Sequence, residues 1–271
     1  MPIDWEHPLS DALRAAAPRP EPDASAAEKK NYAERLSRAL AETMADALRT
    51  RPTFRKITPE KGRGHEIATR SADGKKKLDV RLVNDELGLV FTLSIKTYTF
   101  QDYSPTSGQF GRYQKNVLRN DHELRGEADV IHRRQPYAVM VAIMFMHEGA
   151  TTDGGNKHSS FAHAVFTLRK RAGRVSPHDP RPDRFEKVFI GLFNPTSPAG
   201  DVVFFDVENA PPKDGMPQRR LTLAELVDGI ESLVIERNEV GYVYEDGALE
   251  GVDITEVTVE DVSGADPEPS E

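Results

Sequence analysis

The chain has 271 residues, of which 38% are hydrophobic and 30% charged, and it contains no cysteine. This composition predicts a soluble globular protein with one large domain or two small ones, and it excludes disulfides, thiolate metal ligands and a cysteine nucleophile. The longest apolar run, 137–146, is too short to span a bilayer, and no secretory signal is visible, so we expect a cytoplasmic protein with no membrane partner.

The net charge of −8 is unevenly distributed along the chain. Residues 239–271 contain 11 acidic residues and no lysine or arginine, whereas the rest of the chain has 36 basic against 33 acidic residues. The overall acidity therefore does not exclude a nucleic-acid partner. We predict that residues 241–271 form an acidic, largely disordered tail.

The beginning of the chain predicts a loose segment followed by a long helix. Residues 1–25 are rich in proline and alanine, and we expect a flexible arm that docks through Trp5 and Leu9. Ser25 and Glu28 match a capping box. Apolar residues then recur at steps of four and predict an amphipathic helix over 26–50: Tyr32, Leu36, Leu40, Met44 and Leu48.

Two stretches of β character follow. The sequence GHEIATR, residues 64–70, is compatible with a helix start, but we favour a first strand that turns at Ala72-Asp73-Gly74. Residues 77–100 carry the clearest β signal in the chain, because two apolar runs are joined by a tight turn.

The remaining elements alternate between helix and strand patterns. Residues 113–134 have a helical composition with a break expected near Asn120 or Gly126, and a second capping box, Thr222 with Glu225, opens a helix over 223–237. The strand candidates are 137–146, 161–170, 185–193 and 201–207. Because these strands have no obvious linker between them, we predict one α/β domain over 26–240, with a mixed central β-sheet flanked by helices.

The hairpin 77–100 places charged residues in strands that are otherwise apolar. Side chains alternate between the two faces of a strand, so Ser94 and Lys96 share one face of the second strand. With a two-residue turn at Glu86-Leu87, paired positions sum to 173 and Asp79 lies opposite Ser94. We therefore expect Asp79, Ser94 and Lys96 to form one polar patch, although a structural ion pair or an exposed sheet face would also accommodate Asp79 and Lys96.

A carboxylate beside a lysine is suited to phosphodiester hydrolysis. The carboxylate can hold Mg²⁺ through oxygen ligation, and the ion neutralises a phosphate and lowers the pKa of bound water. The lysine can orient or help to deprotonate that water, or stabilise developing negative charge.

These residues resemble the motif of the PD-(D/E)xK nuclease superfamily, which includes many restriction endonucleases and repair nucleases. The family aspartate would be Asp79, in Lys77-Leu78-Asp79-Val80, and the family lysine would be Lys96, in Ser94-Ile95-Lys96. The resemblance covers roughly residues 27–146 and implies a restriction-endonuclease-like core. It also implies a metal site formed by Asp79 and an upstream glutamate, Glu66, that takes Mg²⁺ or Mn²⁺.

The sequence departs from the family pattern at one position, because Ser94 stands where the second acid belongs. Some restriction enzymes of the superfamily also carry serine there and supply a carboxylate from elsewhere in the fold. Glu66 is the first candidate for that substitute, and Glu123, on the following helix, is the second. Without such a carboxylate, the chain would be a degenerate, inactive copy of the fold.

Basic residues near the hairpin predict a DNA-binding surface. Arg112, Lys115 and Arg119 recur at helical spacing, and Lys75 lies in a lysine run that precedes the first strand of the hairpin. Such a face can follow a phosphate backbone, with Gln114, Asn116 and Asn120 near enough to read base edges. The polar loop 150–160 is a further candidate for DNA contact, and a solvated helix face is the alternative interpretation.

Other catalytic and metal motifs are weak. His147, His158 and His163 flank a glycine-rich loop, but their spacing matches no zinc pattern, and we expect surface or strand-end histidines. The sequence has no P-loop and no nucleophile elbow.

We therefore predict a metal-dependent endonuclease that hydrolyses DNA phosphodiester bonds, in restriction, phage defence or repair, with defence favoured. The resemblance implies a homodimer, because cutting both strands requires two sites; a partner protein of a defence system is the other possibility. The alternative function is a non-catalytic nucleic-acid-binding or interaction subunit of a larger assembly, on a decayed nuclease fold.

Overall fold

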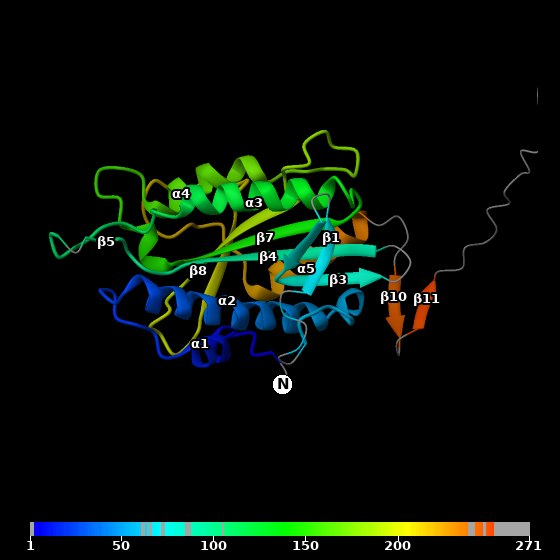
Figure 1. The fold of residues 1–271 in the computed structure, drawn as a ribbon, viewed down its shortest axis with the longest axis horizontal. Coiled ribbons are helices and arrows are strands. Elements are labelled where there is room, and N and C mark those ends of the chain that lie inside the picture. Colours follow the sequence, from blue (N-terminus) through cyan, green and yellow to red (C-terminus); the bar gives the residue numbers. More distant parts are fainter. Residues whose placement is uncertain are drawn as a thin grey trace, which may run out of the picture.

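A mixed five-stranded sheet forms the centre of the fold (Figure 1). Its strand order is β3 (Val80–Asn84), β4 (Gly88–Tyr98), β7 (Val139–His147), β8 (Lys187–Phe193) and β9 (Val202–Asp206). Strands β4, β7 and β8 are parallel, and the edge strands β3 and β9 run antiparallel to their neighbours. The computed structural model describes residues 3–60, 63, 65, 67–71, 74–84, 88–104, 106–237, 242–245 and 248–251.

Helices cover both faces of this sheet and form two separate apolar cores. Helices α3 (Val117–His132) and α4 (Ser160–Leu168) pack on one face, and in Figure 1 they lie above the sheet. Helices α2 (Ala26–Arg49) and α5 (Leu223–Arg237) pack on the other face. The predicted α/β class, with a mixed sheet flanked by helices, is confirmed. Within the described residues, we find no helix that is long and apolar enough to cross a membrane.

Both predicted capping boxes start helices. The Ser25 hydroxyl accepts the backbone N–H of Glu28, while the Glu28 carboxylate accepts from the Ser25 backbone N–H. Thr222 and Glu225 make the same pair of bonds ahead of α5. These bonds satisfy N–H groups that have no partner within the helix, so the two helix starts follow directly from local sequence.

The N-terminal arm contains a short helix that the sequence does not predict. Helix α1 (Ser10–Ala16) packs against α2, and Leu9 is fully buried, as expected for the docking residue. Trp5 remains 37% exposed. The backbone N–H of Leu9 donates to the carbonyl of Gly200, 3.0 Å away. A Cβ at Gly200 would lie within 2.2 Å of the Ser10 nitrogen, so the arm docks on a position that only glycine can occupy.

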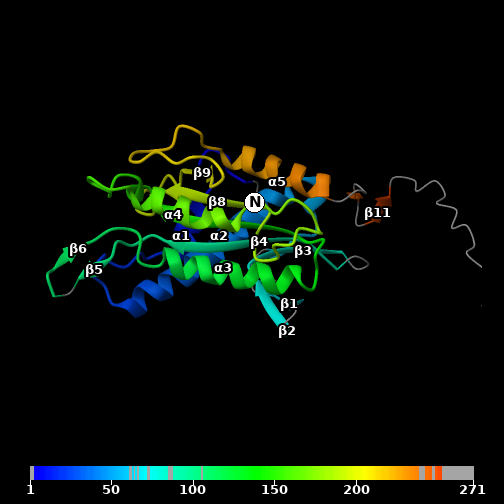
Figure 2. The same cartoon turned by 90° about the horizontal axis from the view of Figure 1, so that it is seen from above.

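Strands β1 (Ile67–Ser71) and β2 (Gly74–Leu78) form a hairpin outside the central sheet. The extended conformation predicted for residues 64–70 is thus confirmed for 67–70, whereas His65 lies in a turn. The hairpin contacts α3 and β4 and stands beside α3 in both views (Figures 1 and 2). It carries the lysine run into the neighbourhood of the β3–β4 hairpin.

Two predictions of secondary structure are wrong. The predicted strand 161–170 is mostly helix α4, because Ser159 caps it and its apolar residues follow a helical repeat. Helix α3 is continuous, so the break expected near Asn120 or Gly126 does not occur. A Cβ at Gly126 would meet nothing within 4 Å, so this glycine occupies an exposed helical position without a packing requirement.

The remaining elements are short. They are η1 (Pro52–Phe54), β5 (Tyr103–Ser104), β6 (Gln109–Phe110), η2 (Glu148–Thr151), η3 (Arg169–Arg171), β10 (Tyr242–Glu245) and β11 (Ala248–Gly251). Most of the predicted acidic tail, residues 252–271, lies outside the described residues.

Candidate carboxylate–lysine site

The β3–β4 hairpin has the predicted register at its open end. Val80 pairs with Leu93 and Leu82 pairs with Phe91, which extrapolates to Asp79 opposite Ser94. The pairing shifts by one residue after Leu82, and the hairpin closes with Asn84 opposite Gly88. The predicted turn residues lie outside the described part of the chain. The bulge is therefore confined to the closed end, and the register beside Asp79 is preserved.

Asp79 lies at the break between β2 and β3. Its Oδ2 accepts the backbone N–H of Ile95 at 2.7 Å. The carboxylate thereby takes a hydrogen bond that a backbone carbonyl of a continuing strand would otherwise accept. Asp79 is thus fixed at the edge of β4, beside the peptide that joins Ser94 to Ile95.

Ser94 and Lys96 lie on the face of β4 that α3 covers. The Ser94 hydroxyl donates to Oε1 of Glu127. Lys96 Nζ is 3.6 Å from Oε2 of Glu123 and 3.8 Å from Oε2 of Glu127. The predicted substitute Glu123 is therefore close to Lys96, and α3 brings a second glutamate to the same place.

Sequence reasoning missed Glu127. Residues four apart lie on the same side of a helix, so Glu123 and Glu127 project together from α3. That spacing was the available signal. The sequence did not indicate which side of the helix faces the sheet. Glu127 is only 5% exposed, although glutamates usually face solvent.

The burial of Glu127 requires compensation. An isolated ionised carboxylate is costly in the protein interior unless it is paired and hydrogen-bonded. Glu127 has the Ser94 hydroxyl on one oxygen, and two ammonium groups near the other, from Lys96 and from Lys76 of β2. Three chain segments that are distant in sequence, namely β2, β4 and α3, therefore meet at Glu127. Asp79 is bound to the backbone of β4 at Ile95 and borders a cavity on the side of α2.

A small cavity opens beside Asp79 from the direction of α2. It has a volume of about 180 Å³. Its lining consists of Glu34, Ser37, Arg38, Ala41, His65 and Asp79. His65 Nε2 is hydrogen-bonded to Oε1 of Glu42 in α2, and this bond holds His65 in place at the side of the cavity. Glu66, the other predicted ligand, lies outside the described residues and stays a prediction.

Three of the four predicted DNA-binding residues are exposed, and the fourth is engaged in contacts within the protein. Arg119 is in α3 with a side chain 75% exposed, and Lys75 and Lys115 are exposed. Arg112 is engaged, because its guanidinium donates to the carbonyl of His158 and lies 3.6 Å from Asp153.

Helix α3 begins only at Val117, so the prediction that Arg112 and Lys115 share a helical face with Arg119 is wrong. Asn120 is buried and is not available to read bases.

The loop 150–160 is anchored by Asp153. Its carboxylate accepts the backbone N–H groups of Tyr113 and Ser160 and the Ser160 hydroxyl. Residues 155–158 remain exposed. The loop therefore has a fixed base and an accessible tip, beside the turn that precedes α3.

Two arginines from the basic clusters are buried rather than superficial. Arg171 pairs with Asp121 at 2.7 Å, and Arg174 pairs with Glu186 at 2.8 Å. Their charges are used inside the protein, so these two arginines add nothing to a basic surface.

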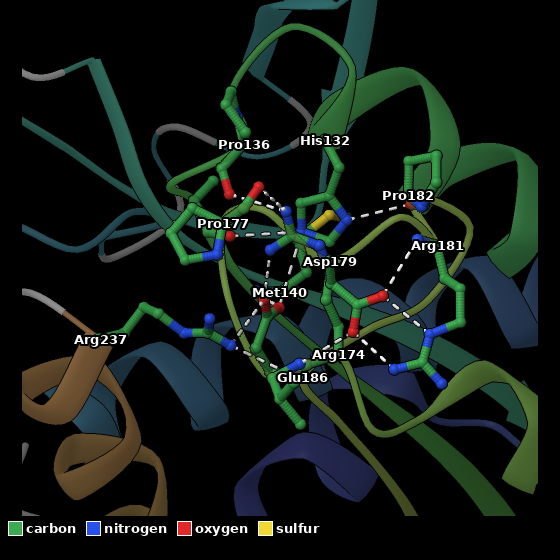
Figure 3. A network of polar contacts seen from close by, with 12 residues as sticks. His132, Pro136, Met140, Arg174, Pro177, Asp179, Arg181, Pro182, Glu186 and Arg237 are labelled. Atoms are coloured by element: carbon green, nitrogen blue, oxygen red, sulfur yellow. Dashed lines mark hydrogen bonds and ion pairs between the residues drawn. The ribbon is translucent and has the colours of Figure 1, made fainter.

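Glu186 is the centre of a buried network (Figure 3). It accepts from Arg174 and Arg237 and from the backbone N–H of Met140, and His132 Nε2 is 3.6 Å away. Burial raises the pKa of Glu186, but the interactions with His132, Met140 and Arg174 outweigh it and leave the pKa below its ordinary value. The network ties the ends of α3 and α5 to the start of β8.

The histidines do not form a zinc site within the described residues, among which no cluster of three or more His, Asp or Glu ligands is found. His147 stacks on Tyr113 with ring centroids 5.0 Å apart, and its Nδ1 accepts the N–H of Gly149. Burial is the main cause that lowers the pKa of His147, with a further contribution from Arg19. These contacts are those of a strand-end histidine, as expected.

The described carboxylates nevertheless have the donor chemistry of a magnesium site. Mg²⁺ in phosphate-cleaving proteins uses one or two carboxylates and completes its shell with water and substrate phosphate. Asp79 and Glu127 are such carboxylates, and they are bound to consecutive residues of β4, Asp79 to the backbone of Ile95 and Glu127 to the side chain of Ser94. Comparison of the chain with protein-family models, with curated proteins and with solved structures gives no match.

Proposed function

We propose that the chain is a metal-dependent endonuclease that hydrolyses DNA phosphodiester bonds. The observation that carries the proposal is the contact of Ser94 and Lys96 with Glu127. In the nuclease motif, an acid stands two residues before the lysine. Here a serine holds that position and binds a carboxylate supplied by α3, which supports Glu127 as the substitute for the missing acid.

The order of elements supports the same proposal. A helix, α2, is followed by the β3–β4 hairpin, a second helix, α3, and strand β7 parallel to β4. This is the order expected for a restriction-endonuclease-like core, with Asp79 before β3 and Lys96 in β4.

The roles of the residues follow from their positions. Asp79 and Glu127 would hold Mg²⁺ or Mn²⁺, with Glu123 within reach of the same lysine. The bound ion would neutralise the phosphate and make a bound water more acidic. Lys96, whose ammonium is fixed between two glutamates, would orient the attacking water and stabilise the negative charge that develops on the phosphate oxygen.

The proposal is tested by incubating plasmid DNA with the purified protein and Mg²⁺ or Mn²⁺. We expect cutting that falls at least about a hundredfold in Lys96→Met, Glu127→Gln and Asp79→Asn. Lys187→Met is the matched control, because Lys187 is also a strand lysine between two carboxylates, Asp206 and Glu208, but lies two strands from β4.

Comparison of the variants with the wild type shows whether the cutting activity belongs to this protein or to a contaminating nuclease. Equal cutting by the wild type and all variants would assign the activity to another protein and remove the proposal. DNA binding that weakens steeply with salt, without cutting under any condition, would favour the non-catalytic binding subunit instead. A role in restriction or phage defence, a homodimeric state and a cytoplasmic location belong to the same proposal.

A further inference from the structure

Lys76 is a second lysine at the candidate site, and it comes from a different part of the chain than Lys96. It lies in β2, in the hairpin that stands outside the central sheet. Its Nζ is 3.7 Å from Oε2 of Glu127, the same oxygen that lies 3.8 Å from Nζ of Lys96. The nuclease motif contains one lysine, so Lys76 has no role in the function as proposed so far.

The two lysines differ in how firmly they are held. The Lys96 side chain is 19% exposed and lies between Glu123 and Glu127. The Lys76 side chain is 38% exposed, twice the exposed fraction of Lys96. Ion pairs that are open to solvent contribute little free energy, so Lys76 can leave Glu127 at small cost.

Electrostatic repulsion would favour movement of Lys76 away from Glu127 when a cation binds. Lys76, Lys96 and Arg119 place three positive charges around the two glutamates of α3. A divalent cation on Glu127 would add two more positive charges within a few ångströms of two ammonium groups, where like charges repel strongly. The repulsion is relieved when the more exposed ammonium turns away.

We propose that Lys76 is a movable counter-ion. It neutralises Glu127 until a divalent cation binds, and it then turns outward and contacts the phosphate backbone of the nucleic acid. This inference rests on the proposed function. A lysine ammonium on a flexible stem is well suited to a phosphate, which it binds as a point charge without fixed geometry.

The first test measures cation binding without DNA. Mn²⁺ is titrated into the full-length protein by isothermal calorimetry for the wild type, Lys76→Met and Lys75→Met. We expect Lys76→Met to bind Mn²⁺ about two- to fivefold more tightly, as removal of one competing exposed charge predicts. Lys75→Met removes the same charge one residue away, on the opposite face of the strand, and should keep the wild-type Mn²⁺ affinity.

The second measurement concerns DNA. In the cutting assay, Lys76→Met should raise KM for plasmid DNA about two- to fivefold with a smaller change in kcat, and should reduce the salt dependence of DNA binding by about one unit of slope. An unchanged KM would overturn the phosphate contact.

The outcomes separate this inference from the proposed function. Equal or weaker Mn²⁺ binding by Lys76→Met, with normal binding by the wild type, overturns the counter-ion role and leaves the nuclease proposal intact. Absence of Mn²⁺ binding by every variant overturns both.

Discussion

The pairing of Lys96 with Glu127 predicts a measurable coupling in protein stability. Lys96→Met removes one ammonium from a carboxylate that is only 5% exposed. Removal of one partner of a fully buried ion pair costs about 3–5 kcal/mol, because the remaining charge is left uncompensated. Here Glu127 keeps Ser94 and Lys76, and Lys96 is itself partly exposed, so we expect a smaller loss of about 1–3 kcal/mol.

The double variant separates the charge effect from lost packing. In a Glu127→Gln background, the methionine at position 96 no longer leaves a charge unpaired at position 127. We therefore expect Lys96→Met to cost at least about 1 kcal/mol less there than in the wild type. Catalysis should not recover with stability, because the proposed metal ligand Glu127 and the proposed catalytic Lys96 are both absent.

Urea denaturation monitored by circular dichroism, on the wild type, the two single variants and the double variant, gives the coupling free energy. In a protein of this size, a loss of 1 kcal/mol also lowers Tm by roughly 2–4 °C, which provides an independent check. A coupling indistinguishable from zero, with unchanged m-values, would mean that Lys96 and Glu127 do not interact in solution, and the reasoning about the site would be refuted.

Three further predictions concern the surroundings of the site. Because the folded pKa of Glu186 lies below its ordinary value of 4.5, its stabilisation is complete above pH 4.5 and is lost as pH falls through the folded pKa; Glu186→Gln should lower stability at pH 7 and flatten the acid limb of a stability–pH profile. Gly200→Ala should release the N-terminal arm to limited proteolysis, since its Cβ would meet the backbone of Leu9 at 2.7 Å, whereas Gly215→Ala, which also has a positive φ but open space around it, should cause strain without release. Arg119→Ala should reduce the slope of log affinity for DNA against log salt by about one, as measured by fluorescence anisotropy in the presence of a chelator.

The sequence predicted those features that depend on local chemistry. The capping boxes at Ser25 and Thr222 mark helix starts because each satisfies its own backbone donors within three residues. The register of the β3–β4 hairpin was predicted correctly from Val80 to Leu82, where a slip of one residue would turn every core side chain to the wrong face. The assumed two-residue turn was wrong, because Asn84 pairs with Gly88 after the register shift.

The sequence failed where tertiary packing decided between two local solutions. Residues 161–168 are apolar enough to be a buried strand or a buried helix, and periodicity alone does not separate these in a short run. Ser159 caps the segment and Asp153 binds Ser160, so the segment begins as a helix. The acidic partners of Arg171 and Arg174 could not be predicted either, because the chain must fold before Asp121 and Glu186 come close to them.

Ser94 and Glu127 are best understood as one unit. Strand β4 and helix α3 approach so closely here that the two side chains share a hydrogen bond in a buried setting. An acid at position 94 would face the Glu127 carboxylate, and two carboxylates at that distance cannot both remain ionised at low cost. A hydroxyl, by contrast, donates a hydrogen bond to the carboxylate. In the proposed nuclease site, a serine at position 94 is therefore compatible with a carboxylate supplied from the helix instead of the strand.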